Sequence, residues 1–254
     1  DDATSELYSA FFVEEEGTRS SLRGLQEVIG TKGLFSALYT DRGSHYWHTD
    51  EAGGQVDKSR PTQVHRALQP LGVTRIPAYS PEARGRSERA FRTLQDRLPK
   101  ELALAGITEM AAANRYLAEQ VLPAYNQRFA VPASEPGTAF IPWIGTPLAE
   151  ILCVQEERVV AKDNTVRYQG LSLQIPQDPH RFHYVKVTVR VHEYPDGTLA
   201  VFHGPRCLAR YHAEGQLIEP GRAQPRRSGP THGSDIPPIV DPRPTVRATI
   251  SARA

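Results

Sequence analysis

The chain has 254 residues, a formal net charge of +1 and an apolar fraction of 39%, which is typical of a soluble globular protein with a sizeable core. Because the charges nearly cancel, any attraction to nucleic acid must come from local clusters of Arg and Lys. The two cysteines, Cys153 and Cys207, exclude a disulfide framework and lack the spacing of a zinc site. With no apolar run of the ~20 residues that cross a bilayer, and no signal-peptide pattern, the sequence predicts a cytoplasmic protein that binds no membrane.

The N-terminal segment has the pattern of a strand that follows a turn. Residues 7–13 are apolar and aromatic and short enough for a buried strand, and the polar residues Asp1–Thr4 in front of them suit a hairpin turn. We therefore expect residues 7–13 to pair with a strand upstream of Asp1. The abrupt start without an initiator Met likewise predicts that the chain is a fragment of a longer protein.

Helix and strand patterns then alternate, which predicts an α/β fold. The expected elements are, in order, a helix at 18–29 capped by Thr18, a strand at 34–40, a helix from Pro61 to Leu71, a strand at 73–76, a helix whose apolar face is marked by Phe91, Leu94 and Leu98 before Pro99 perturbs it, and a helix at 108–126.

The second half has a different texture. Residues 131–150 are rich in Pro and Gly and lose periodicity, as a linker does. Strand patterns follow, with a hairpin signal at Asp196-Gly197, and they predict a small β-barrel at 151–212. Residues 213–254 have few large apolar side chains, so we expect a disordered tail. The expected strands are 159–161, 166–168, 171–175, 185–192 and 199–202.

Two carboxylates stand beside regular structure as ligand groups often do. Asp41 follows a buried strand, at the carboxyl end where α/β sheets place ligand groups. Glu88 lies near the first turn of the helix that follows a polar loop at 77–85. Together they could ligate Mg²⁺, a hard cation that needs only one or two protein carboxylates beside phosphate oxygens. A two-metal site of this kind supports phosphoryl transfer by in-line displacement.

Several motifs resemble one family when they are taken together. The opening Asp-Asp-Ala-Thr-Ser, YTDRGS at 39–44 and YSPEARGRSERAFRTLQDRL at 79–98 are similar to the retroviral-integrase-type catalytic core of bacterial insertion-sequence transposases, most closely the ISNCY group. The segments EERVVAKDNTVRYQGLSLQI and VRVHEYPDGTLAV resemble the C-terminal β-barrel of that group. The resemblance implies a ribonuclease-H-like core at 1–130, with a mixed sheet flanked by helices.

Carried over to this sequence, the resemblance makes Asp41 and Glu88 the second and third acids of a DDE triad that binds Mg²⁺ or Mn²⁺. The first aspartate of the family lies on the strand before the Asp-Asp-Ala-Thr turn, so the resemblance implies that this chain lacks it. The spacing from Asp41 to Glu88 is longer than in related enzymes, and the insertion falls around Gly53 and Gly54.

Basic residues near these positions are expected to contact DNA phosphates. For each of them a solvated protein surface is an equally good interpretation. The predicted DNA-binding residues are Arg84, Arg86, Arg89 and Arg92 around Glu88, and Lys162 and Arg167 in the β-domain.

Each acidic residue also has a simpler interpretation. Asp41 could be a turn residue after a strand, and Glu88 could be a helix-start acid paired with Arg84 or Arg92. Glu82 is a second-ranked alternative to Glu88. The loop residues His45, His48 and Asp50 lack recognised ligand spacing, so we interpret them as polar surface. Tyr46 and Trp47 could stack on bases, but packing over the sheet edge is favoured.

The resulting hypothesis is a DDE-type transposase that nicks transposon 3′ ends and joins them to target DNA, as a homo-oligomer on DNA. The rival hypothesis is a catalytically incomplete DNA-binding or assembly fragment of such a protein. A two-carboxylate glycoside hydrolase is disfavoured by the flanking arginines. No helix-turn-helix is evident, so the sequence does not give the DNA ends that are recognised.

Overall fold

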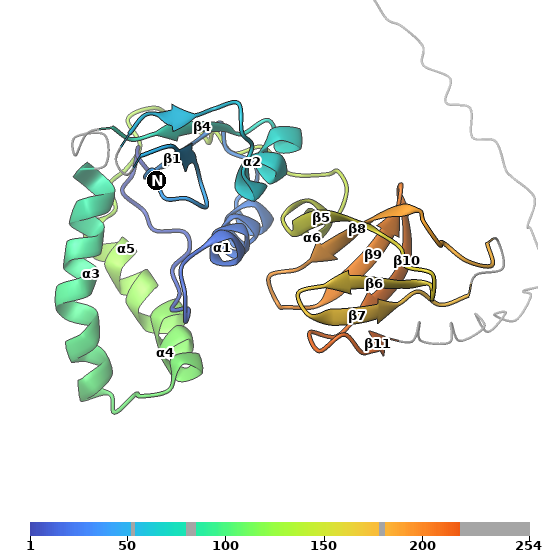
Figure 1. Cartoon of the computed structure of the whole chain (residues 1–254). Coiled ribbons are helices and arrows are strands. Elements are labelled where there is room, and N and C mark those ends of the chain that lie inside the picture. Colours follow the sequence, from blue (N-terminus) through green and yellow to red (C-terminus); the bar gives the residue numbers. More distant parts are fainter. Residues whose placement is uncertain (52–53, 80–84, 178–180, 219–254) are drawn as a thin grey trace, which may run out of the picture. The chain divides into compact units, whose positions relative to one another are not determined.

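The computed structural model describes residues 1–51, 54–79, 85–177 and 181–218. The chain divides into two units, Asp1–Ile218 and Glu219–Ala254. The second unit, and with it most of the tail predicted to be disordered, lies outside the described residues. The first unit contains an α/β part followed by an all-β part (Figure 1). No helix in the described portion is both long and apolar enough to cross a bilayer.

A parallel pair of strands forms the centre of the α/β part. β1 (Ala37–Thr40) and β4 (Thr74–Pro77) pair in parallel, with Thr40 opposite Pro77. The ladder extends one step further, because the Ala78 N–H donates to the Thr40 carbonyl over 2.9 Å. Both strands were predicted, and the structure shortens the first at its start. The described part of the sheet is parallel rather than mixed.

Helices α1 (Thr18–Thr31) and α2 (Gln63–Leu68), with the 3₁₀ turn η1 (Gln69–Leu71), enclose the first core. Thr18 was predicted to cap α1, but the cap lies one residue earlier, where the Gly17 N–H donates to the Ser20 hydroxyl over 2.9 Å. Thr62 caps α2 by accepting from the His65 N–H. The buried side chains of this core confirm the predicted helix faces and are Leu22, Leu25, Ile29, Val64, Ala67, Leu68, Leu71, Val73 and Leu152.

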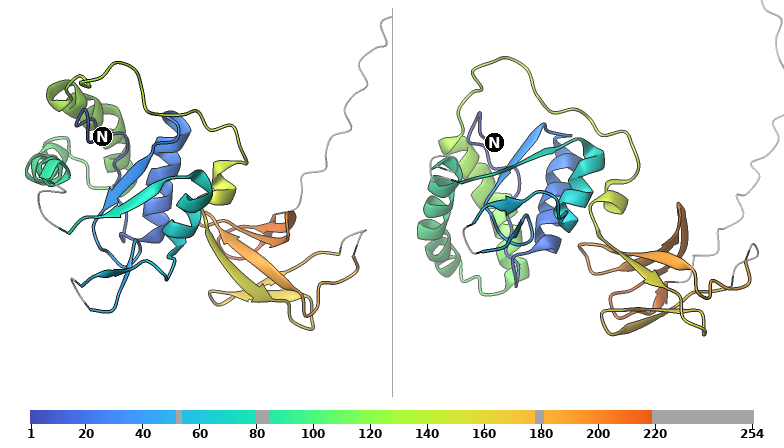
Figure 2. Two further views of the ribbon diagram at one scale, coloured as in Figure 1. Left: turned by 90° about the horizontal axis from the view of Figure 1, so that it is seen from above. Right: turned by 45° about the horizontal axis from the view of Figure 1, so that its top comes forward.

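A second group of helices lies on the other side of β1 and β4 (Figure 2). It comprises α3 (Gly85–Leu104), α4 (Met110–Tyr116), the π-helical turn η3 (Leu117–Val121) and α5 (Leu122–Phe129). Pro99 does not end α3, which continues to Leu104. Leu98 is buried against Leu117 and Val121. Phe91, predicted on the same face, is 56% exposed, whereas its neighbour Ala90 is buried, so the buried face of α3 is offset from the predicted one.

Residues 7–13 are extended but do not form a strand, which corrects the prediction. Their backbone pairs with side chains, since the Leu7 N–H and C=O bond to the Asn126 amide over 2.8 and 2.9 Å. Phe12 makes the same two bonds with Asn114, over 2.6 and 3.1 Å. No other described strand pairs with this segment, so two helical amides supply the contacts that a neighbouring strand would otherwise make.

Residues 130–147, which include most of the linker predicted at 131–150, carry no described helix or strand, whereas residues 148–150 of that prediction are helical. Residues 130–147 contact the α/β part at several points, and at one of these Leu34 and Ile141 exchange two backbone hydrogen bonds of 2.7 and 2.9 Å. The glycine before Leu34 permits this approach, because a Cβ at Gly33 would lie 2.6 Å from the Ile141 carbonyl oxygen. The short helix α6 (Leu148–Ile151) then leads into the β-domain.

The all-β part agrees with the predicted strand-rich segment and adds two strands, but the strand predicted at 159–161 lies earlier, at Val154–Val159. A five-stranded antiparallel sheet and a two-stranded hairpin share one core, whose largest fully buried side chains are Tyr168 and Tyr211. The sheet order is β11-β10-β9-β8-β5 and the hairpin is β6-β7. The strands are β5 (Val154–Val159), β6 (Thr165–Tyr168), β7 (Leu171–Gln174), β8 (Thr188–Glu193), β9 (Leu199–His203), β10 (Arg206–Tyr211) and β11 (Leu217–Ile218).

The predicted start of the tail at residue 213 is therefore wrong. A tight turn reverses the chain after β10, with the Gly215 N–H donating to the His212 carbonyl over 2.9 Å. Gly215 adopts a φ of 81°, which glycine tolerates without strain. Leu217 and Ile218 then pair with Tyr211 and Arg210, so the regular structure extends to Ile218. A remaining pair of short strands, β2 (His48–Thr49) and β3 (Val56–Asp57), forms a separate antiparallel ribbon.

The asparagine contacts to residues 7–13 generate a stability prediction. Asn114→Ala or Asn126→Ala leaves two backbone groups of a half-buried segment unpaired, so each should lower the free energy of unfolding by about 1–3 kcal/mol. Urea unfolding measures this change. Gln127→Ala, at an exposed position beside Asn126 on α5, should change stability by less than about 0.5 kcal/mol. Equal effects of Asn126→Ala and Gln127→Ala would contradict the assignment.

Candidate functional site

Asp41 lies directly after β1, at the carboxyl end of the parallel pair. Its Oδ1 accepts a hydrogen bond from the Gly43 N–H over 3.0 Å, which closes a tight turn. The Gly43 carbonyl in turn accepts from the Tyr46 and Trp47 N–H groups, each over 2.9 Å. Residues 41–47 thus form a compact turn at the sheet edge, and Asp41 is half-buried at its start.

Gly43 packs closely against this carboxylate and against the His45 ring. A Cβ at that position would lie 3.0 Å from Asp41 Oδ1 and 3.0 Å from His45 Cε1, closer than ordinary packing allows. The Asp41 carboxylate and the His45 imidazole therefore lie against the same side of Gly43. His45 Nε2 is buried, and it has no hydrogen-bond partner among the described residues.

Glu88 lies in the first turn of α3 and is exposed. The chain reaches it from the end of β4, and β4 ends beside β1. Asp41 and Ala78, which directly follow β1 and β4, consequently leave the parallel pair at the same end; the two strands are labelled in Figure 1. Glu82, the alternative ligand, lies outside the described residues.

The predicted arginines fall into two groups. Arg89 and Arg92 are exposed on α3, and the Arg89 Nε donates to the Gly85 carbonyl over 3.1 Å. Arg86 belongs to α3 by its backbone, and Arg84 lies outside the described residues. An exposed guanidinium beside the helix start is accessible both to a phosphate and to water.

Lys162 and Arg167 belong to the β-domain. Lys162 lies in the turn between β5 and β6, and Arg167 lies on β6 opposite Ser172. Both are exposed, whereas Val166 and Tyr168 on either side of Arg167 point into the core. This alternation agrees with the half-buried pattern expected from the sequence.

Tyr46 and Trp47 pack as predicted. Trp47 is 3% exposed and stacks under the Arg75 guanidinium, 4.1 Å from the ring centroid. The Tyr46 hydroxyl accepts from Ser21 over 3.1 Å. Both aromatic side chains therefore pack against the protein at the turn after β1, rather than projecting to stack on a nucleotide base.

The residue types around Asp41 suit a divalent ion such as Mg²⁺. Such ions prefer oxygen ligands and accept one or two carboxylates completed by water and substrate phosphate. Over residues 1–51, 54–79, 85–177 and 181–218, however, no three His, Cys, Asp or Glu side chains gather around one point. The loop residues His45, His48 and Asp50 accordingly form no such cluster.

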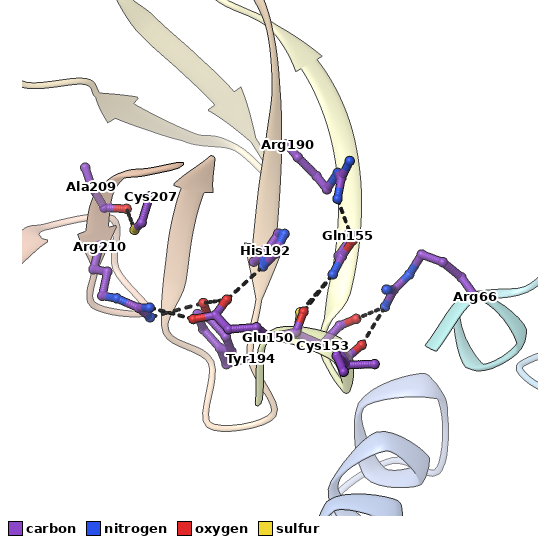
Figure 3. Close-up of polar contacts among 11 residues, drawn as sticks. Arg66, Glu150, Cys153, Gln155, Arg190, His192, Tyr194, Cys207, Ala209 and Arg210 are labelled. Atoms are coloured by element: carbon purple, nitrogen blue, oxygen red, sulfur yellow. Dashed lines mark hydrogen bonds and ion pairs between the residues drawn. The ribbon is translucent and has the colours of Figure 1, made fainter. Parts of the chain in front are cut away.

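A different cluster, which no sequence motif indicates, gathers titratable side chains around Glu150 (Figure 3). Glu150 of α6 accepts hydrogen bonds from the Tyr194 hydroxyl over 2.7 Å and from Arg210 over 2.6 Å. His192 Nδ1 lies 3.2 Å from the same carboxylate. Burial alone would raise the pKa of Glu150, but the bonds from Arg210 and Tyr194 outweigh it and hold that pKa below its usual value.

These groups fasten α6 to the β-domain rather than forming a reaction centre. His192 is 4% exposed and stacks on Phe202 with ring centroids 4.2 Å apart. Burial lowers the pKa of His192 to about 4, although Glu150 opposes the shift. Burial likewise raises the pKa of the nearby Cys153 thiol to about 11, so this cysteine is not a thiolate at neutral pH.

Sequence comparison identifies relatives of the chain. It is 33% identical over 205 residues to the putative transposase y4bF of Sinorhizobium fredii (strain NBRC 101917 / NGR234), which covers 79% of this chain and 44% of that protein. It is 27% identical over 129 residues to the transposase for insertion sequence IS1202 of Streptococcus pneumoniae, covering 51% of this chain and 28% of that protein. The chain is similar to bacterial transposases. It spans less than half the length of either relative.

Two further comparisons add context. No family model matches the chain. Among solved structures, a chain in the simian T-cell lymphotropic virus intasome in complex with the PP2A regulatory subunit B56 gamma is 15% identical, with a TM-score of 0.36. That match covers 82% of this chain and 66% of the viral assembly's chain.

The Glu150 cluster predicts an acid-sensitive stability. Because the folded pKa of His192 is depressed to about 4 from 6.5, the unfolded chain binds the proton more readily, and stability falls as pH drops through this window. Between pH 7 and pH 5, protonation of His192 in the unfolded chain should lower the free energy of unfolding by roughly 2 kcal/mol. The stability of His192→Gln, measured by urea unfolding, should therefore fall by about 2 kcal/mol less than that of wild type between pH 7 and pH 5. His183→Gln, at an exposed position, is the control, and an identical pH slope in both variants would contradict the assignment.

Proposed function

We propose that the chain is part of a DNA transposase in which Asp41 and Glu88 hold Mg²⁺ or Mn²⁺. The observation that carries this proposal is the parallel pairing of β1 and β4, which directs Asp41 and the segment before Glu88 to one sheet edge. The similarity to two bacterial transposases supports it independently. In this proposal residues 1–130 are a ribonuclease-H-like core, 131–150 a linker and 151–212 a small barrel.

The proposed reaction is nicking at the 3′ ends of an insertion sequence, followed by joining of those ends to target DNA. When bound, the divalent ion would supply charge neutralisation at the scissile phosphate and lower the pKa of a coordinated water. Asp41 would contribute carboxylate oxygens from a turn whose backbone is internally hydrogen-bonded. Glu88 would contribute oxygens from the start of α3. No covalent intermediate on the protein is required.

Arginine side chains of α3 would hold the DNA backbone beside these acids. Arg89 and Arg92 are exposed on the helix that carries Glu88, and a guanidinium binds phosphate with paired hydrogen bonds. Lys162 and Arg167 would add phosphate contacts from the β-domain, where both are exposed. The partners proposed are transposon ends and target DNA, bound by a homo-oligomer that joins two ends.

One observation favours a second candidate function. The described residues bring together no cluster of three acidic, His or Cys side chains, and the chain covers less than half of its transposase relatives. The chain would then act as a catalytically incomplete fragment that contributes DNA binding and assembly. This candidate predicts salt-sensitive DNA binding that divalent metal does not change.

Metal binding separates the two candidates. Asp41→Asn and Glu88→Gln should each weaken the affinity of the chain for Mn²⁺ by about tenfold or more, because each removes a charged ligand. Electron paramagnetic resonance of free Mn²⁺ measures the affinity. Asp57→Asn is a matched control, since Asp57 also closes a turn, by accepting from the Ser59 N–H over 2.8 Å. Equal Mn²⁺ affinity in wild type, Asp41→Asn and Asp57→Asn would favour the incomplete fragment.

The role proposed for the arginines is tested by salt dependence. If Arg89 and Arg92 each contact a phosphate, replacing either with Ala should reduce the slope of log affinity against log salt by about 0.9 on duplex DNA. The loss should be the same for any DNA sequence, because phosphate contacts carry no base information. Fluorescence anisotropy gives the slopes. Arg97→Ala serves as the control, since Arg97 pairs with Glu101 on the same helix. Unchanged slopes in Arg89→Ala and Arg92→Ala would remove these residues from the interface.

A further inference from the structure

The turn that begins with Asp41 is closed by one buried side-chain bond. Trp47 Nε1 donates to the Thr40 hydroxyl over 2.8 Å, and these residues are 3% and 5% exposed. Thr40 is the last residue of β1, and Trp47 ends the turn. The bond therefore joins the two ends of the segment that carries Asp41.

The position of Trp47 is fixed from a second strand. Arg75 of β4 lies over the indole ring, 4.1 Å from its centroid, and its guanidinium also donates to the Tyr46 carbonyl. The Thr62 hydroxyl donates to that same carbonyl over 3.1 Å. Two elements outside the turn thus hold residues 46 and 47 in place.

The free end of the turn depends on this anchor. Gly43 receives both the Tyr46 and the Trp47 N–H on its carbonyl, while its own N–H donates to Asp41 Oδ1 over 3.0 Å. A chain of hydrogen bonds therefore runs from the Trp47 backbone to the Asp41 carboxylate. Loss of the bond between the Trp47 indole and Thr40 would therefore loosen the hydrogen-bonded residues that orient the Asp41 carboxylate.

We infer that Trp47, through its indole N–H bond to Thr40, is a positioning residue that fixes the Asp41 carboxylate for metal binding. The inference rests on the proposed function, since it concerns the ligand proposed there. Trp47 itself is buried and does not contact the ion. Its contribution is preorganisation, because a ligand already held in place loses less conformational entropy when it binds.

Two substitutions remove the bond from opposite sides. Trp47→Phe keeps an aromatic ring in the buried space but lacks the N–H donor, and Thr40→Val keeps the β-branched shape but lacks the acceptor. Because both delete one bond, the double variant should differ little from either single variant. Thermal unfolding establishes that each variant is folded, and Thr40→Val carries the test if Trp47→Phe is not.

The second tryptophan of the chain supplies a matched control. Trp143 Nε1 donates to the Thr146 carbonyl over 2.7 Å, in the segment between the two parts of the chain. Trp143→Phe removes an indole N–H bond, here an exposed one, without touching the Asp41 turn. It should leave every property of that turn unchanged.

The first readout uses the full chain without metal. Hydrogen exchange should show the Gly43, Tyr46 and Trp47 amides protected in wild type and in Trp143→Phe. In Trp47→Phe and Thr40→Val their protection should fall by about tenfold, as expected for loss of a buried hydrogen bond. Unchanged protection of the Gly43 amide in both folded variants would overturn the inference, whatever the metal does.

The second readout is Mn²⁺ affinity, measured with the metal alone. Trp47→Phe and Thr40→Val should weaken it by about tenfold, the lower end of the effect of losing a group that orients a metal ligand. Wild-type affinity in both variants, alongside lost binding in Asp41→Asn, would overturn the inference but keep the proposed metal site. Wild-type affinity in Asp41→Asn would instead remove both, and the exchange data would still report whether Trp47 orders the turn.

Discussion

The parallel pairing of β1 with β4 is the constraint on which the candidate site depends. Thr40 and Pro77 lie opposite each other, and one further bond from Ala78 to Thr40 keeps the strands together at their carboxyl ends. Since parallel strands deliver their following residues to one edge, Asp41 and the approach to α3 emerge together. The flanking helices bury one side of this pair through Val64, Leu68 and Val73, which makes the register costly to change.

At three places in this chain a side-chain amide bonds to both the N–H and the C=O of one extended residue, as a paired strand would. Asn126 and Asn114 each bond to both backbone groups of one residue in the extended segment 7–13. Gln63 of α2 does the same for Gln155 of β5, over 2.8 and 3.1 Å. In residues 7–13 extended backbone thereby satisfies polar groups without a neighbouring strand, and at Gln155 the amide bonds to the edge of β5 that is not paired with β8.

Periodicity predicted most of the helices and strands, because a face such as Val64, Ala67 and Leu68 reveals its helix from sequence alone. It failed where tertiary contacts decide the outcome. Residues 7–13 have a strand-like composition, yet their hydrogen bonds go to helical asparagines, which no local pattern indicates. The Glu150–His192–Arg210 cluster assembles residues far apart in the chain, and the Trp47–Thr40 bond depends on how the turn folds. Motifs singled out Asp41 and Glu88, but their anchoring residues required the structure.

The most direct test of the proposed site is whether one metal ion binds close to both Asp41 and Glu88. With ¹⁵N-labelled chain and substoichiometric Mn²⁺, paramagnetic broadening falls off steeply with distance from the ion. The account predicts that the amides of Gly43 and of Ser87 to Arg89 broaden together at the same Mn²⁺ concentration, while those of the β-domain stay sharp. Broadening confined to one of the two segments, or spread evenly over the chain, would contradict a metal site shared by Asp41 and Glu88.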